Sequence, residues 1–486
     1  MTRNYILTHL GRCQQEFLDR VFVRGKISVY VMTNFQKGGD VDRDEAKKIC
    51  DKVLSYSSAQ ETEVIMQSGS SALTRFANNQ IEQNVNETGV SLSVRTVFGK
   101  KVGRASTNML DEKSLRKMVE AAQILARVQP DDEELLPMPE AQRYTELKNY
   151  VEATAEFGPK ERAEALKNII SRCRKEKTLT ASGIFSNEDR LLALANSKGL
   201  FACDRMTEAV FSATVMTDDS AGWAEETNKD VREIDIEKVG RVAIEKAVSS
   251  KKPAAIKPGE YTVILEPSAA GDLLIFLGWL AFGALAYQEG RSFISGKLGQ
   301  KVFGENITIE DNVYHDMASG LPFDFEGMPR QRVALIEKGV AKNVVHSRRT
   351  AKKAKTETTG HGLPEPNTSG PIPLNLALAP GNSTLEEMIK STERGILVTQ
   401  FHYTNTVNPM KLILTGMTRN GTFLIENGKV NGAVKNLRFT ESLGKILSNV
   451  EMLGKELVKT RGFFGGGLVT PAMKAKNFTF SSTTEF

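Results

Sequence analysis

The chain has 486 residues, more than one hydrophobic core normally serves, so two or three domains are expected. Hydrophobic residues make up 40% and charged residues 25% of it, a balance that excludes a wholly disordered or low-complexity protein. The net charge of +5, from 64 basic and 59 acidic residues, is spread over a large surface, whereas nucleic-acid binders usually concentrate their basic charge.

Residues 1–31 share little patterning with the following sequence, and we interpret them as a possible N-terminal extension. They contain no continuous apolar run followed by a cleavage site of small residues, so no secretory signal is expected. The chain also has four widely spaced cysteines and no CxxC pair, which is typical of a reducing compartment. These features predict a cytoplasmic protein.

An N-terminal α+β domain is predicted over residues 32–129. Apolar residues at helical spacing indicate a helix at residues 111–128, with Asp111 as its N-cap, and a second helix is expected at residues 42–55. From Glu61 onward, short runs rich in Val, Ile, Leu and Thr are separated by Gly and Asn. This pattern predicts a meander of strands between the two helices.

Residues 130–157 begin with an acidic stretch that contains several prolines, and we interpret them as a linker. A middle subdomain follows at residues 158–255. Its pattern indicates a helix at 160–175, strands within 178–217 and another helix at 235–249.

The C-terminal domain, residues 256–486, is predicted to be mainly antiparallel β, because alternating strands are joined by short turns containing Gly. Residues 273–287 (LLIFLGWLAFGALAY) form the most apolar stretch and predict one buried helix. That helix is shorter than the roughly 18 to 20 residues needed to cross a bilayer, so no membrane association is expected. The fold class as a whole is α+β.

Familiar catalytic motifs are absent from the sequence. No HExxH, GxSxG or CxxC occurs, and none of the five histidines lies three or four residues from another. Residues 346–355 carry five basic side chains but no aromatic residue that could stack on bases, so a solvated loop is predicted there. Residues 360–373 are rich in Gly and Pro and predict a second loop.

Several segments together resemble the TldD/PmbA family, also called modulators of DNA gyrase. The similar segments are residues 74–81 (TRFANNQI), 102–108 (VGRASTN), 358–364 (TTGHGLP), 394–403 (RGILVTQFHY) and 415–428 (TGMTRNGTFLIENG). The resemblance covers most of residues 60–455, and the last segment is long enough to be specific. It implies a relation to zinc metallopeptidases.

Catalytic members of that family carry an HExxxH motif on a helix of the C-terminal domain. The resemblance implies that its two histidines hold zinc, that its glutamate is the general base, and that a cysteine in a glycine-rich segment completes the site. Three protein ligands leave one zinc position for a water whose pKa falls towards 7, ready to attack a peptide carbonyl.

In this chain the three motif positions fall on Ile275, Phe276 and Leu280, all of which are apolar. The glycine-rich segment 462–467 keeps its glycines but contains no cysteine, and none follows Cys203. We therefore expect no metal or other cofactor in this chain, and zinc only in a catalytic partner.

This pattern resembles the TldE (PmbA) branch of the family, whose members pair with a TldD-type subunit into a peptidase that acts on small unfolded peptides. The resemblance implies a TldD-type partner, or a homodimer in its absence, and a peptide substrate. Candidate residues for a peptide groove or a partner contact are Ser292, Ser295, Gly296, His361, His402 and Arg419.

Two alternatives remain open at this point. The chain could be an autonomous metallopeptidase that uses a different arrangement, involving His361 or His402. It could instead bind nucleic acid or act on gyrase through its basic residues Arg348, Arg349, Lys352, Lys353 and Lys355, although nucleic acid is the less favoured ligand because their stretch lacks aromatic residues.

Overall fold

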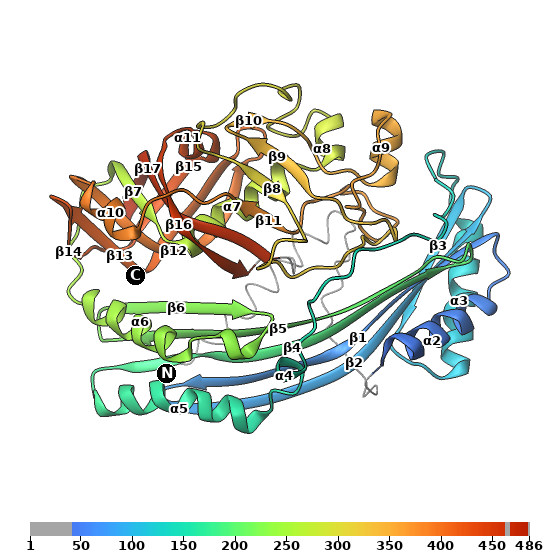
Figure 1. Ribbon diagram of the computed structural model, residues 1–486, viewed down its shortest axis with the longest axis horizontal. Coiled ribbons are helices and arrows are strands. Elements are labelled where there is room, and N and C mark those ends of the chain that lie inside the picture. Colours follow the sequence, from blue (N-terminus) through green and yellow to red (C-terminus); the bar gives the residue numbers. More distant parts are fainter. Residues whose placement is uncertain (1–40, 462–466, 485–486) are drawn as a thin grey trace.

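The computed structural model describes residues 41–461 and 467–484. The predicted N-terminal extension, residues 1–31, lies outside them, as does the glycine-rich segment apart from Gly467. Figure 1 shows a long curved sheet with helices on its outer side and a second, β-rich unit stacked above it. The predicted α+β fold class is confirmed.

The lower layer is a six-stranded antiparallel sheet with the strand order β3-β2-β1-β4-β5-β6. Its strands are β1 (Glu61–Ala77), β2 (Gln80–Phe98), β3 (Lys101–Thr107), β4 (Thr180–Asn196), β5 (Phe201–Met216) and β6 (Ala221–Asn228). β1 pairs with β4, so the strands predicted for the N-terminal domain and for the middle subdomain form one continuous sheet.

Four long helices cover one face of this sheet, as Figure 1 shows along its lower and right-hand sides. They are α2 (Arg43–Ser55), α3 (Glu112–Val128), α5 (Pro159–Lys175) and α6 (Ile236–Ser249). All four were predicted within one residue at each end, and Asp111 caps α3 by accepting the backbone N–H of Ser114. A Cβ at Gly103 would lie 2.2 Å from the carbonyl oxygen of Ala122, so only glycine lets α3 lie this close to β3.

The upper layer contains the remaining strands, and most of its strand pairs are antiparallel. They are β7 (Gly259–Leu265), β8 (Ile309–Asp311), β9 (Val333–Glu337), β10 (Val340–Ala341), β11 (Leu376–Leu378), β12 (Arg394–Asn408), β13 (Ile413–Glu426), β14 (Lys429–Ala433), β15 (Leu437–Ser442), β16 (Val450–Arg461) and β17 (Gly467–Thr483).

Five of these strands close into a ring. β17 pairs with β15 on one side and with β7 on the other, and β12 and β13 complete the circuit. Aromatic side chains fill its interior, among them Phe401 and Phe439, whose ring centroids are 4.7 Å apart. This packed interior is the main core of the C-terminal domain.

The apolar stretch 273–287 is not one helix, so that prediction was wrong. Helix α7 (Pro267–Ala281) starts six residues earlier and stops at Ala281, and the short α8 (Ala284–Gln288) follows. The break lies at Gly283, which pairs with Val345 through a backbone bridge and approaches the loop at Pro371. A Cβ at Gly283 would lie 2.5 Å from the Pro371 carbonyl oxygen.

The basic segment 346–355, predicted as a loop, contains helix α9 (Arg348–Ala354). A capping box between Ser347 and Thr350 begins this helix. The prediction of a loop rested on the basic residues and did not take this motif into account. Residues 360–373, in contrast, contain no helix or strand, as predicted. The other short helices are α4 (Glu152–Ala155), η1 (Val231–Glu233), α10 (Leu385–Lys390) and α11 (Leu443–Ser448).

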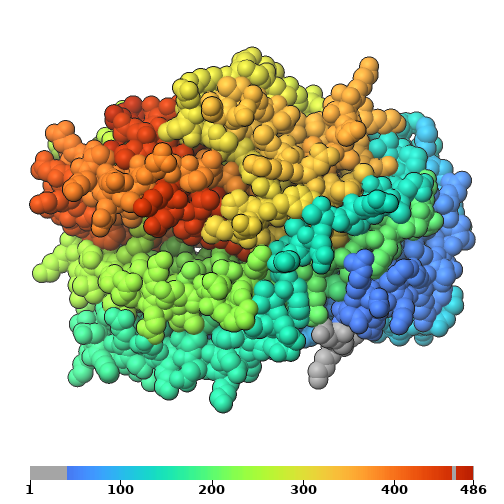
Figure 2. All heavy atoms as spheres, in the orientation of Figure 1, coloured from blue at the N-terminus to red at the C-terminus, as the bar shows by residue number. Residues whose placement is uncertain are grey.

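The predicted linker ties the two layers together. Between α3 and α4 it has no helix or strand, and Tyr144 and Asn149 donate hydrogen bonds to the carbonyl oxygens of Gly327 and Gly320 in the upper layer. Figure 2 shows its teal atoms along the boundary between the yellow and orange C-terminal residues and the green and blue sheet. No helix within the described ranges is long and apolar enough to cross a membrane.

Candidate functional site

Helix α7 carries the three positions that the sequence comparison singled out. Pro267 occupies its first turn, where the missing N–H costs nothing, and its apolar side chains pack onto the ring of strands. Two glycines allow α7 to pack closely against this core. A Cβ at Gly271 would lie 2.5 Å from the Thr460 hydroxyl oxygen, and one at Gly278 would lie 2.4 Å from a Leu376 methyl carbon. The backbone of α7 is therefore fixed by close packing.

The side chains at the three positions are apolar and lie against the core. Phe276 is 8% exposed, whereas Ile275 and Leu280 are half-buried and pack on the core from its edge. Phe276 also meets Trp279 with ring centroids 6.4 Å apart. None of the three offers a nitrogen, oxygen or sulfur atom.

Asp272, one turn before Ile275, is an ionisable side chain of α7 that no sequence motif singled out. Its carboxylate accepts the backbone N–H of Phe401 at 3.1 Å, at the edge of β12. Burial raises the pKa of Asp272 to about 7, since the hydrogen bond from Phe401 only partly offsets it and Glu225 raises it further. A lone carboxylate in an otherwise apolar helix was the available signal.

Replacing Asp272 with asparagine is expected to stabilise the protein at pH 8 and to change little at pH 4. The raised pKa means that wild-type stability is highest in acid and is lost as the pH rises from about 4 towards 7. Asparagine can still accept the Phe401 N–H but never ionises, so the variant avoids a loss of stability on the order of 4 kcal/mol. Urea unfolding at both pH values measures this. Asp316→Asn, at an exposed position, is the control, and equal effects of the two variants would contradict the expectation.

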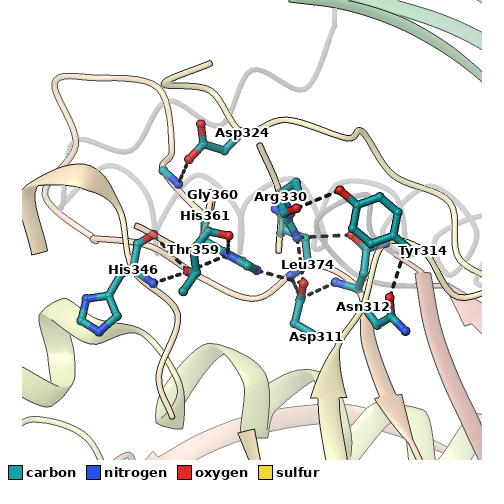
Figure 3. A network of polar contacts seen from close by, with 12 residues as sticks. Asp311, Asn312, Tyr314, Asp324, Arg330, His346, Thr359, Gly360, His361 and Leu374 are labelled. Carbon is teal, nitrogen blue, oxygen red and sulfur yellow. Dashed lines mark hydrogen bonds and ion pairs between the residues drawn. The ribbon is translucent and has the colours of Figure 1, made fainter. Parts of the chain in front are cut away.

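His361 lies at the centre of a buried polar network in the upper layer (Figure 3). Its Nε2 forms a hydrogen bond with Asp311 Oδ1 at 2.9 Å, and its Nδ1 lies within hydrogen-bond distance of the Thr359 hydroxyl at 2.9 Å and of the Thr359 carbonyl oxygen at 2.8 Å. Burial, followed by the nearby Arg330, lowers the pKa of His361, so the ring stays neutral. Both ring nitrogens are occupied, and the side chain has no capacity left for a ligand.

A pair of buried carboxyl groups lies beside this network. Asp324 accepts the backbone N–H groups of Glu326, Met328 and Gly362, and Glu326 accepts that of Arg348 at 2.8 Å, at the start of α9. Burial raises the pKa of both, and the charge of Asp324 adds to the effect on Glu326. The pair joins three segments of irregular backbone and has a structural role.

Ser292, Ser295 and Gly296 lie in the turn that follows α8. The Ser292 hydroxyl donates to the carbonyl oxygen of Ala281 at 2.6 Å, at the end of α7, and the Ser295 hydroxyl donates to that of Tyr287 at 3.0 Å. Gly296 adopts a φ of +72°, which favours glycine. Both serine hydroxyls therefore pair with backbone carbonyl groups near the ends of helices α7 and α8.

His402 and Arg419 lie on the neighbouring strands β12 and β13. Among the described residues, the buried imidazole Nε2 of His402 has no hydrogen-bond partner. Burial and then the nearby Arg419 lower the pKa of His402 to about 4. No hydrogen bond or ion pair found in the described ranges connects this pair to His361. The structure thus brings together only two of the six candidate side chains predicted for a groove.

Three models of one protein family match the chain in consecutive segments. They describe PmbA/TldA metallopeptidase domain 1 at residues 62–126, the central domain at 152–251 and the C-terminal domain at 258–482. The chain belongs to the PmbA/TldD family. The resemblance seen in its sequence motifs is thereby confirmed.

Some relatives are distant in sequence but cover more than four fifths of the chain. A metalloprotease TldD homolog of Buchnera aphidicola is 24% identical over 84% of this chain and 89% of its own length. Metalloprotease PmbA of Escherichia coli O157:H7 is 22% identical over 86% and 92%. The crystal structure of TldE from Thermococcus kodakarensis superposes with a TM-score of 0.80 at 23% identity, over 90% of this chain and 99% of that one. This last likeness establishes a shared fold.

The side chains at the family's metal positions do not fit zinc. Zinc in proteins is bound by histidine nitrogen, cysteine sulfur or carboxylate oxygen, and Ile275, Phe276 and Leu280 provide none of these atoms. In the part of the chain that the structure describes, no three His, Cys, Asp or Glu side chains are grouped so that they could hold a metal.

Proposed function

We propose that this chain is the TldE-like subunit of a TldD/TldE-type zinc metallopeptidase that degrades small unfolded peptides, and that it contributes no metal ligand of its own. The observation that carries this proposal is the apolar occupation of Ile275, Phe276 and Leu280 on a tightly packed α7. Zinc and the hydrolytic water then belong to a TldD-type partner, and a homodimer is the state expected in its absence.

A strand edge beside α7 supports a role in peptide binding. Within the described residues, β12 pairs with β7 only from Gly395 to Val398, so its later residues have β13 on one side only. Asp272 occupies one backbone N–H of this edge, at Phe401. An extended peptide can add to the remainder through main-chain hydrogen bonds, which recognise unfolded chains without regard to sequence.

The nucleic-acid alternative loses support from the basic segment. Arg348 donates to the carbonyl oxygen of Pro137, and Arg349 forms an ion pair with Asp132 at 2.5 Å. Both side chains thus hold α9 to the linker. The free, buried thiols of Cys50, Cys173 and Cys203 agree with the cytoplasmic location that we propose.

Affinity purification of the tagged chain from its own cells is expected to retain a TldD-type protein in about equimolar amount. The isolated chain should contain no stoichiometric zinc and should not cleave peptides, whereas the complex should contain zinc and lose activity to a chelator. Repeated purification without such a partner would contradict the proposal.

The autonomous-enzyme alternative gives the opposite result. Stoichiometric zinc in the isolated chain, with chelator-sensitive cleavage that His402→Gln or His361→Gln abolishes, would establish that alternative.

A further inference from the structure

Arg419 is a half-buried arginine without a counter-ion. In the described ranges, each of the other buried or half-buried arginines donates at least one hydrogen bond, as Arg162 does to Asn187 at 2.7 Å. No acceptor for the Arg419 guanidinium is found there. Burial lowers the pKa of Arg419, and the neighbouring Tyr403 offsets only part of this effect. None of its nitrogens is completely buried, so the guanidinium is accessible and free to pair with an anionic ligand.

His402 presents a second unsatisfied group beside Arg419. In the β12–β13 ladder Gln400 faces Arg419 and His402 faces Met417, so His402 and Arg419 are diagonal neighbours on one face of the sheet. The Nε2 atom of His402 is buried and has no partner. Among the described residues, two adjacent polar groups from separate strands therefore have no hydrogen-bond partner.

The backbone next to these donors departs from a regular strand. The register of β12 shifts between His402 and Asn405, and Tyr403 adopts a φ of +53°, a conformation that costs free energy for a bulky side chain. Tyr403 is 58% exposed, and its ring centroid is 4.5 Å from that of the His402 imidazole. A bulge that exposes an aromatic ring beside unpaired donors is typical of a binding site.

We propose that Arg419 and His402 form a carboxylate-binding site that takes the C-terminal carboxylate of a short peptide. A planar carboxylate matches the guanidinium fork of Arg419 and can also accept from the Nε2–H of His402. The choice of a peptide rests on the proposed function, whereas the anion site stands on the two unpaired donors alone.

The charge of the site favours a monoanion. Burial and then Arg419 lower the pKa of His402 to about 4, so the ring is neutral at pH 7 and donates a hydrogen bond without adding charge. The single positive charge of Arg419 is balanced by one carboxylate. A phosphate dianion would retain an uncompensated charge in a half-buried position.

Calorimetric titration of the full-length chain with one short unstructured peptide, prepared as the free acid and as the C-terminal amide, tests this inference. The free acid is expected to bind about tenfold more tightly, the usual gain from a hydrogen bond to a charged group. In Arg419→Gln the two forms should bind equally. Arg419→Lys should keep part of the difference, because it retains the charge without the fork. Arg172→Gln, which removes an exposed arginine on α5, should keep all of it.

Two further measurements complete the test. The Hε1 proton resonance of His402, identified by its absence in His402→Gln, should shift when the free acid is added and stay fixed when the amide is added. Inorganic phosphate should compete only weakly with the free acid. Equal binding of acid and amide by the wild type, or an undiminished difference in a folded Arg419→Gln, would overturn the inference. Because neither measurement requires hydrolysis or a partner, failure of the proposed complex would leave this result interpretable.

Discussion

Replacing Asp311 with alanine is expected to lower the free energy of unfolding by about 3–5 kcal/mol, the usual cost of breaking a buried ion pair from one side. Asp311 is fully buried and accepts from Arg330, from His361 and, at 2.7 Å, from the backbone N–H groups of Leu374 and Asn375. Burial alone would raise the pKa of Asp311, but Arg330 and His361 outweigh it and hold the pKa well below its usual range. The alanine variant leaves the Arg330 guanidinium buried and without its countercharge.

Urea unfolding at pH 7 measures this loss, with Asp316→Ala, at a nearby exposed position, as a control expected within about 0.5 kcal/mol of the wild type. The lowered pKa of Asp311 also sets the pH dependence. Its stabilisation is present above the unfolded-state pKa of about 4 and is lost as the pH falls further. The difference between wild type and variant should therefore narrow in acid, and a difference independent of pH would contradict the ionic origin.

Replacing Glu63 with alanine is expected to lower the free energy of unfolding by a similar amount, because its carboxylate forms ion pairs with two arginines. Its two oxygens accept from Arg95 and Arg104, each at 2.7 Å, and its side chain is only 3% exposed. Arg104 in turn donates to the carbonyl oxygen of Glu365 in the upper layer. Glu63→Ala leaves two buried guanidinium groups without their counter-ion and should cost about 3–5 kcal/mol.

Glu63→Ala should also loosen the loop formed by residues 358–373, because Arg104 anchors this loop to the lower layer. Hydrogen exchange of the loop amides is expected to become faster in Glu63→Ala than in the wild type. Glu87→Ala, which removes an exposed carboxylate from the neighbouring strand β2, is the control. If Glu63→Ala is destabilised but hydrogen exchange of the loop amides is unchanged, Glu63 supports only the lower sheet.

The helices of the lower layer could be predicted from the sequence because their signals are local. Capping residues such as Asp111 and the spacing of apolar side chains along α3 depend on neighbours within one or two turns. The union of two segments into one sheet could not be predicted, because the pairing of β1 with β4 joins residues more than a hundred positions apart. The break between α7 and α8 could not be predicted for the same reason: it depends on contacts of Gly283 with Val345 and Pro371, which are distant in the sequence.

The candidate site was predictable only in part. The apolar replacements at Ile275, Phe276 and Leu280 are visible in the sequence once the family motifs are aligned. The raised pKa of Asp272 depends on burial against β12, and no local pattern reports that. The missing acceptor of Arg419 is likewise a property of the folded surroundings.

The closed ring of strands has a kinetic consequence. The ring closes where β17 pairs with β7, for example at Phe478 and Tyr261, and these two residues are far apart in the sequence. Most strand pairs of the lower sheet join neighbours in sequence. Because closing long loops slows folding, the lower sheet should form first, and ring closure should set the rate at which the native protein appears.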